Sequence, residues 1–242
     1  MDIRQTILAE MRVLPEIDAQ HEISRRVSFI KKTLLASGLK NLVLGISGGV
    51  DSSTCGRLAQ LAVDELNAET ASKDYRFVAV RLPYGVQADE EDAQRSLKFI
   101  QPSMALTVNI KGAADSLHDE GMASRKAANA LSASEFQLDF TKGNVKARQR
   151  MVAQYDVAGI LGALVFGTDH SAENITGFYI KYGGEAVDLA PLFGLNKRHV
   201  RVLVQTLGVP LALVVTLPTA DLESLVPGEK DEGESGRSKK MK

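Results

Sequence analysis

The feature that most constrains the fold of this chain is an apolar run, Leu42–Ile46, which leads directly into glycines and small hydroxyl residues at Ser47–Ser53. An apolar run of this length beside a turn predicts a buried strand, and the residues that follow predict a helix. Glycine lets the backbone approach an anion closely, and the first N–H groups of a helix have no partner inside it. The junction therefore predicts a phosphate-binding loop. The alternative is a plain helix cap after a glycine turn.

The loop differs from the common phosphate loop G-x-x-x-x-G-K-S/T because it has no lysine. It contains Asp51 instead, a carboxylate suited to holding Mg2+ beside phosphates. A Ser-Gly-Gly-x-Asp-Ser loop after a strand resembles the pyrophosphate-binding loop of the N-type ATP pyrophosphatases, which cleave ATP between its α- and β-phosphates. The resemblance implies that ATP is bound by a continuous stretch comprising Gly45, Ile46, Ser47, Gly48, Gly49, Val50, Asp51, Ser52 and Ser53.

Strands and helices alternate along the rest of the chain. Apolar runs predict further strands at Phe77–Leu82, within Ala105–Ile110 and at Ala163–Phe166, with helical spacing between them. Two helices, about Ile3–Met11 and Asp18–Ser37, precede the first strand, with Asp18 as the expected cap of the second, and a stronger helix is expected at Lys146–Leu161. This alternation is typical of an α/β fold, so we expect a doubly wound parallel sheet with helices on both faces and extra N-terminal helices. By resemblance, this is the fold of the adenine nucleotide alpha-hydrolases.

Length and charge narrow the function classes. The 242 residues carry a formal net charge of −1, which gives no basic field to attract nucleic acid. No apolar run reaches the length of a membrane span and no apolar signal segment opens the chain, so we expect no membrane partner and a cytoplasmic location. We expect a single domain over residues 1–223 and a polar, disordered tail over 224–242. The single cysteine, Cys55, excludes an internal disulfide and is expected to be a packing residue.

Two residues after later strands have the chemistry that a bound nucleotide requires. Glu173 follows the fourth strand near the start of a predicted helix, where it can share a Mg2+ with Asp51. The alternative for Glu173 is a favourable charge in a first helical turn. Lys197 begins another predicted helix, where a cation opposes the helix dipole unless it reaches an anion. His170 is either a general base or a structural histidine.

In combination these segments resemble one family, the ammonia-dependent NAD synthetases. The order of the motifs is that of the family, and they extend from the N-terminal helices to about Leu222. The first motif is shared by ATP pyrophosphatases in general, whereas the later set is specific to NAD synthetases. The matching segments are Gly45–Ser52, Val80–Gly85, Lys142–Arg148, Gly167–His170 with Glu173, Thr176–Phe178, Lys181–Gly183, Leu195–Arg198 and Pro218–Leu222.

The resemblance implies a ligase that forms NAD from deamido-NAD and ammonia, with Mg2+ as cofactor and ATP as co-substrate, and that assembles as a homodimer. It implies catalytic roles for Asp51, Lys197 and Glu185, and Mg2+ binding by Asp51 and Glu173. It adds further ATP contacts at Arg81, Gln87, Thr168, Lys197 and Thr219. It also implies that deamido-NAD is bound by Arg148, Lys181 and Asp188.

The chain departs from the family in two places. The family has an aspartate that accepts a proton from ammonium where this chain has Gly184, and Glu185 lies one residue later. The family also continues beyond Leu222 with a helix and a His-Lys pair that we do not recognise in residues 224–242. We therefore expect ATP–Mg2+ binding to be retained better than deamido-NAD binding. The alternatives are another ATP pyrophosphatase that amidates or thiolates a different acceptor, and a catalytically weakened nucleotide-binding homologue.

Overall fold

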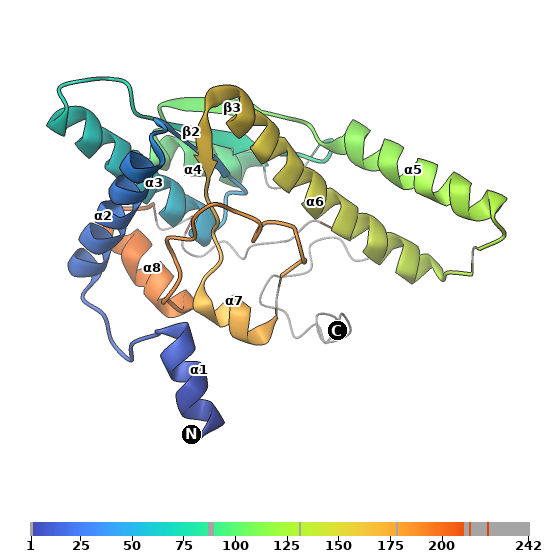
Figure 1. The fold of residues 1–242 in the computed structure, drawn as a ribbon, viewed down its shortest axis with the longest axis horizontal. Coiled ribbons are helices and arrows are strands. Elements are labelled where there is room, and N and C mark those ends of the chain that lie inside the picture. Colours follow the sequence, from blue (N-terminus) through green and yellow to red (C-terminus); the bar gives the residue numbers. More distant parts are fainter. Residues whose placement is uncertain are drawn as a thin grey trace.

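A four-stranded parallel sheet forms the centre of the molecule (Figure 1). The computed structural model describes residues 2–86, 90–130, 132–177 and 179–210, together with 213 and 222. The spatial order of the strands is β3-β2-β1-β4. All four expected strands are present, with ends that differ by a few residues from the expectation. They are β1 (Asn41–Gly45), β2 (Arg76–Arg81), β3 (Met104–Thr107) and β4 (Ala163–Val165).

Helices separate the strands and surround the sheet, which confirms the expected α/β class. They begin with α1 (Ile3–Met11) and α2 (Ala19–Ser37), the two helices expected ahead of the sheet. Asp18 caps α2 as predicted, because its carboxylate accepts a hydrogen bond from the His21 N–H at 2.8 Å. The others are α3 (Val50–Glu69), α4 (Glu90–Ile100), α5 (Lys111–Ala127), α6 (Glu135–Leu161), α7 (Ser171–Thr176) and α8 (Lys197–Thr206).

The two faces of the sheet are covered by different helices because side chains alternate along each strand. Leu42 and Leu44 of β1 pack on the face covered by α2, α3 and α8. Val43, between them, packs on the opposite face, where Val157 and Ala158 of α6 cover it. The sheet is therefore doubly wound, as expected. Strand order reverses between β1 and β4, and ligands in such sheets bind beyond the carboxyl ends of the strands at that point.

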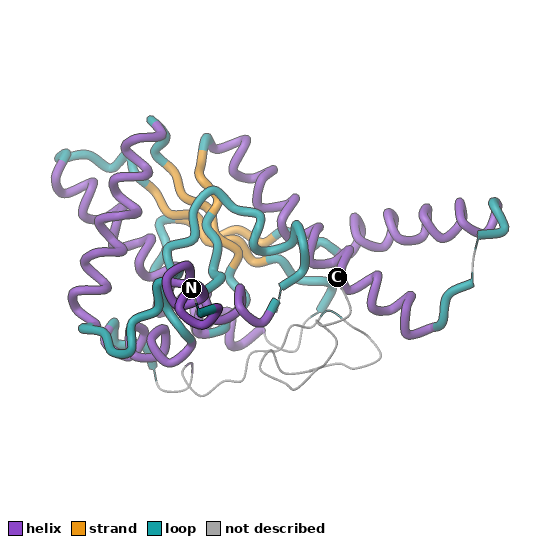
Figure 2. The backbone as a smooth tube through the Cα atoms, turned by 60° about the horizontal axis from the view of Figure 1, so that its bottom comes forward, coloured by secondary structure: helices purple, strands orange, loops and turns teal. Residues whose placement is uncertain are grey.

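Helix α6 is longer than its sequence pattern indicated. We expected a strong helix only from Lys146, but α6 begins at Glu135, because Ser134 and Gln137 form a reciprocal capping box ahead of it. The added turns pair with α5, and the two helices project together from the body of the molecule (Figure 2). Within the described residues, none of the helices combines the length and the apolar character that a membrane span needs.

Candidate nucleotide and metal site

The predicted phosphate loop lies between β1 and α3, at the carboxyl edge of the sheet. Gly49 is the N-cap of α3, and its N–H donates to Ser47 Oγ at 3.3 Å. Gly48 adopts a φ of 93°, in the left-handed region that favours glycine. A Cβ at Gly48 would also lie 2.7 Å from the backbone nitrogen of Ala93 in α4. The loop is therefore closely packed against α4, and only glycine fits at this position.

Asp51 lies in the first turn of α3 and faces α8. Its Oδ2 accepts a hydrogen bond from Lys197 Nζ at 2.6 Å, across 146 positions of sequence. Its Oδ1 is buried and accepts no hydrogen bond from the described part of the chain. A buried carboxylate oxygen without a donor is costly, so this atom requires a cation or a donor from a ligand. The structure thus brings together Asp51 and Lys197, two of the residues expected to be catalytic.

Glu173 of α7 also lies close to Asp51. Ligand atoms of Asp51, His170 and Glu173 all lie within 4.8 Å of one another. The pKa of Glu173 is raised to about 8, mainly by burial and also by the nearby carboxylates of Asp51 and Asp169, while a hydrogen bond from the His170 N–H opposes the shift. A divalent cation would remove this penalty. The donor set includes two carboxylates, the kind of oxygen ligand that Mg2+ prefers.

Asp169 is a member of this acidic cluster that the sequence analysis did not single out. It lies between the β4 exit and α7 and is half-buried. Burial, together with the charges of Glu185 and Asp51, raises the pKa of Asp169 to about 6. Its position directly after Thr168, at the exit of β4, is the sequence signal from which a role in the site could have been predicted. Glu185 is thus near the cluster, and its carboxylate accepts a hydrogen bond from the Gly183 N–H at 3.2 Å.

The other expected ATP contacts are only partly described. Arg81, the last residue of β2, is buried and forms a two-pronged ion pair with Glu90 at the start of α4, one bond being Nη1 to Oε1 at 2.7 Å. Thr168 lies half-buried after β4, beside Asp169. Gln87 and Thr219 lie outside the described residues. The ATP contacts expected of these four residues stay predictions.

The residues expected to bind deamido-NAD lie on α6 and on the segment after α7. Arg148 Nε donates a hydrogen bond to the backbone oxygen of Lys181 at 3.1 Å, so α6 and the segment after α7 are joined here. Asp188 Oδ2 accepts from the Val165 N–H at 2.7 Å, and its Oδ1 accepts from Tyr155 at 3.3 Å. The Asp188 carboxylate is thus bonded to the backbone of β4. Substrate binding by these three residues stays a prediction.

A basic cluster at the β2 exit was not predicted as a unit. Tyr84 donates its hydroxyl proton to Asp115, which also pairs with Lys111 and Lys142. Lys146 Nζ lies 4.2 Å from the centre of the Tyr84 ring and donates to the Leu222 backbone oxygen at 2.8 Å. We name these residues the Tyr84 cluster. It joins two of the motifs, Val80–Gly85 and Lys142–Arg148, which the sequence analysis treated separately.

Cys55 behaves as the packing residue that was expected. It is buried in α3, and its Sγ contacts the Gly167 backbone oxygen at 3.3 Å. Burial raises the pKa of its thiol, so the thiolate needed for nucleophilic chemistry is disfavoured.

The doubly wound sheet places this chain among the α/β proteins, and the acidic cluster beside the glycine loop has a donor set that fits a divalent cation. The sequence matches the family described as NAD synthase over residues 22–240. It is 61% identical over 230 residues to the NH(3)-dependent NAD(+) synthetase of Vibrio vulnificus, covering 95% of this chain and 83% of that protein. It is 60% identical over 236 residues to the enzyme of the same name from Pseudoalteromonas translucida, covering 98% and 85%. The chain belongs to the NAD synthase family.

Solved structures agree with this assignment. The NAD+ synthetase of Burkholderia pseudomallei superposes with a TM-score of 0.80 at 48% identity, covering 94% of this chain and 81% of that one. An NMN synthetase from Francisella tularensis superposes with a TM-score of 0.71 at 26% identity, covering 90% and 81%. The three NAD synthetases named above are therefore more similar in sequence to this chain than this NMN synthetase is.

Proposed function

We propose that this chain is an ammonia-dependent NAD synthetase, a ligase that amidates deamido-NAD with ammonia and converts ATP to AMP and pyrophosphate. The observation that carries the proposal is the convergence of Asp51, Glu173 and Lys197 beside the glycine loop. This arrangement supplies both a cation site and a fixed ammonium group where a triphosphate would lie. Family membership identifies the acceptor, because the site alone supports ATP cleavage without specifying what is adenylated.

In the first step, a carboxylate oxygen of the nicotinate group attacks the α-phosphorus of ATP. The bond from that phosphorus to the bridging oxygen breaks, and pyrophosphate leaves. Backbone N–H groups at the start of α3, within Ser47–Ser53, bind phosphate oxygens, and Lys197 neutralises charge that develops on them. Asp51 and Glu173 would hold Mg2+, which supplies further charge neutralisation when bound. No protein nucleophile is needed, because positioning and charge neutralisation are sufficient for this chemistry.

In the second step, ammonia attacks the activated carbonyl carbon, and the bond to the AMP oxygen breaks. Ammonium must lose a proton before it can attack. We assign Glu185 as the acceptor of this proton, because it is near the acidic cluster and the family's aspartate is absent at Gly184. The Gly183 N–H donates a hydrogen bond to the Glu185 carboxylate, and this bond orients the carboxylate.

Arg148, Lys181 and Asp188 are proposed to contact deamido-NAD.

We also propose a homodimer, because α6 exposes apolar side chains to water, Val152 and Ile160 among them. A cytoplasmic location follows from the need for ATP as co-substrate. Sedimentation of the purified protein tests the dimer, and a monomer at micromolar concentration would contradict it.

The decisive experiment incubates the protein with ATP, Mg2+ and ammonium, and with either deamido-NAD or nicotinate mononucleotide as acceptor. We expect AMP and NAD in equal amounts with the dinucleotide and much slower turnover with the mononucleotide. Pyrophosphate release only with another acceptor would identify a different ATP pyrophosphatase. Binding of ATP without turnover would identify a weakened homologue. Separate titrations of ATP and deamido-NAD then test whether nucleotide binding is the better retained of the two.

A further inference from the structure

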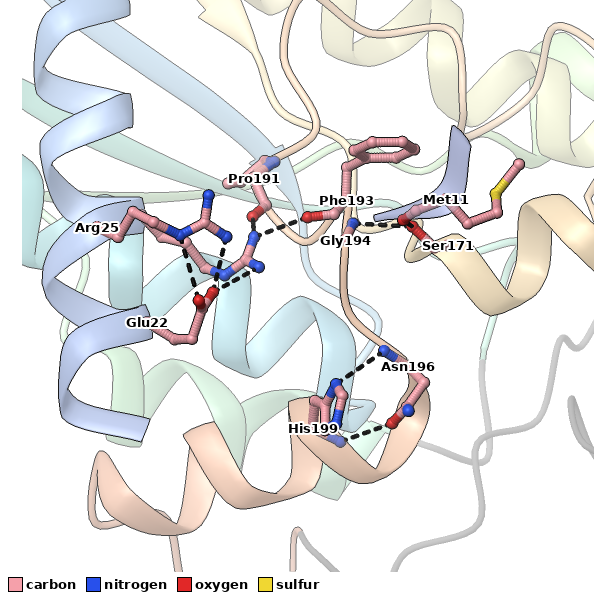
Figure 3. A network of polar contacts seen from close by, with 10 residues as sticks. Met11, Glu22, Arg25, Ser171, Pro191, Phe193, Gly194, Asn196 and His199 are labelled. Carbon is pink, nitrogen blue, oxygen red and sulfur yellow. Dashed lines mark hydrogen bonds and ion pairs between the residues drawn. The ribbon is translucent and has the colours of Figure 1, made fainter. Parts of the chain in front are cut away.

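The described residues contain a second polar network, away from the phosphate loop, that no motif predicted (Figure 3). Its centre is Arg26 of α2, whose side chain is only 4% exposed. Arg26 Nη2 donates to Glu22 Oε2 at 2.9 Å, one helical turn earlier on α2. A buried guanidinium is costly unless its donors are bonded. Nε of Arg26 has no hydrogen-bond partner among the described residues, so the Nη groups make the bonds that hold the side chain.

Those donors point at the segment that precedes Lys197. Arg26 Nη1 donates to the backbone oxygen of Phe193 at 3.0 Å and also to that of Pro191. A planar guanidinium directed at two carbonyl groups fixes both the position and the orientation of the segment. The next residue, Gly194, has a φ of 85°, so the chain turns here before α8 begins.

The same segment is attached on its other side to the helix that carries Glu173. Gly194 N–H donates to the hydroxyl of Ser171 at 2.8 Å, and Ser171 N–H donates to the Leu195 backbone oxygen at 3.1 Å. Ser171 is the first residue of α7 and is fully buried. Asn196 then caps α8 by accepting from the His199 N–H at 3.0 Å, and Lys197 follows directly.

We propose that Arg26 is a positioning residue for Lys197, acting through the segment Pro191–Asn196. The proposal rests on the proposed function only in taking Lys197 as a phosphate contact. Arg26 of α2 and Ser171 of α7 both bind the segment. Lys197 follows the segment directly and donates a hydrogen bond to Asp51. Loss of the Arg26 bonds lets α8 shift, and a displacement of about 1 Å at a charged contact is enough to lower affinity and rate severalfold or more.

The test uses Arg26→Lys, which keeps the charge opposite Glu22 but cannot hold two carbonyl oxygens in a planar fork. Arg25→Lys is the matched control, because Arg25 binds the same Glu22 carboxylate at 2.8 Å and its side chain is 54% exposed. The probe is Mg2+ with α,β-methylene-ATP, which cannot be cleaved at the bond in question, titrated by calorimetry. Binding of this probe is independent of the acceptor, so failure of deamido-NAD amidation and failure of this inference are distinguishable.

A double-mutant cycle with Lys197→Met separates positioning from general destabilisation. We expect Arg26→Lys to weaken probe binding roughly tenfold in the parent protein and to have almost no effect when Lys197 is already replaced. We expect Arg25→Lys to bind the probe like the parent. Equal weakening by Arg26→Lys in both backgrounds, or no weakening in either, would overturn the proposal. If Arg26→Lys does not fold, Glu22→Gln with Arg26→Met removes the ion pair as a unit and enters the same cycle.

Discussion

Two charged clusters at the carboxyl edge of the sheet have opposite electrostatic character. The acidic cluster at the β1 and β4 exits contains Asp51, Asp169 and Glu173, and the pKa values of Asp169 and Glu173 are raised by burial and by neighbouring carboxylates. In the Tyr84 cluster at the β2 exit, hydrogen bonds from Lys111, Lys142 and Tyr84 hold the pKa of Asp115 well below its usual range.

The contrast separates a site that requires a ligand from one that is already satisfied. The acidic cluster has surplus negative charge and a buried Asp51 oxygen with no donor among the described residues. In the Tyr84 cluster, by contrast, each lysine has a partner, either Asp115 or, for Lys146, the Leu222 carbonyl group and the Tyr84 ring. We therefore expect catalysis to depend on the first cluster and mainly local stability to depend on the second.

The largest effect is expected at Asp51. Replacing it with Asn removes a metal ligand and the partner of Lys197, and should lower the rate of AMP formation roughly a thousandfold, or about 4 kcal/mol. Asp64→Asn is the control, since Asp64 lies on the same helix but is exposed and bonded to Gln60 at 2.7 Å. Near-normal turnover of Asp51→Asn in a coupled pyrophosphate assay would show that the acidic cluster is not the reaction site.

A smaller effect is expected at Gly48. Alanine there meets the α4 backbone at 2.7 Å in addition to the strain of a φ of 93°. Gly38→Ala has a comparable φ of 72° but no atom within 4 Å, so it isolates the conformational cost. We expect about 1 kcal/mol of destabilisation for Gly38→Ala and about 3 kcal/mol for Gly48→Ala in urea unfolding. The KM for ATP should rise only for Gly48→Ala, and equal behaviour of the two variants would contradict close packing of the loop.

The third prediction concerns pH and Asp115. The pKa of this group is lower in the folded protein than its unfolded value of 3.8, so its pairing stabilises the fold above about pH 4 and is lost as the pH falls through the lowered pKa. Asp115→Asn should therefore cost up to about 1 kcal/mol at pH 7 and progressively less in acid. Urea unfolding of the parent and the variant at pH 7 and in acid measures this cost, with Asp119→Asn, an exposed position on the same helix, as control. A cost that is larger in acid than at pH 7 would contradict the prediction.

The smallest effect is expected for Tyr84→Phe. It removes one hydroxyl donor to Asp115, which keeps Lys111 and Lys142 as partners. The free energy of unfolding should fall by less than about 1 kcal/mol, and the rate of NAD formation should stay close to that of the parent protein. A loss of rate that approaches the Asp51→Asn effect, without a matching loss of stability, would mean that the Tyr84 cluster also binds substrate.

Sequence reasoning succeeded where neighbouring residues decide the structure. The Asp18 cap and the strand–glycine–helix junction at Leu42–Ser53 follow from backbone preferences and apolar spacing over a few residues. Pairing of Asp51 with Glu173 was anticipated because both follow strands that end at one edge of a parallel sheet. The same reasoning did not identify Asp169, because the role of this residue depends on which carboxylates lie near it in the folded chain. It also predicted a start for α6 that was too far along the sequence.

By itself, the sequence determined the fold class, the glycine loop between β1 and α3 and the family, because these depend on local periodicity and on residue types at fixed short spacings. Only the tertiary structure decided that Lys197 meets Asp51, that Glu90 holds Arg81 and that Arg26 holds the segment before α8. The first and last of these contacts join residues that are far apart in the sequence, and all three depend on how the elements pack. Strand order and helix packing place such groups together, and no short-range pattern in the chain specifies that placement.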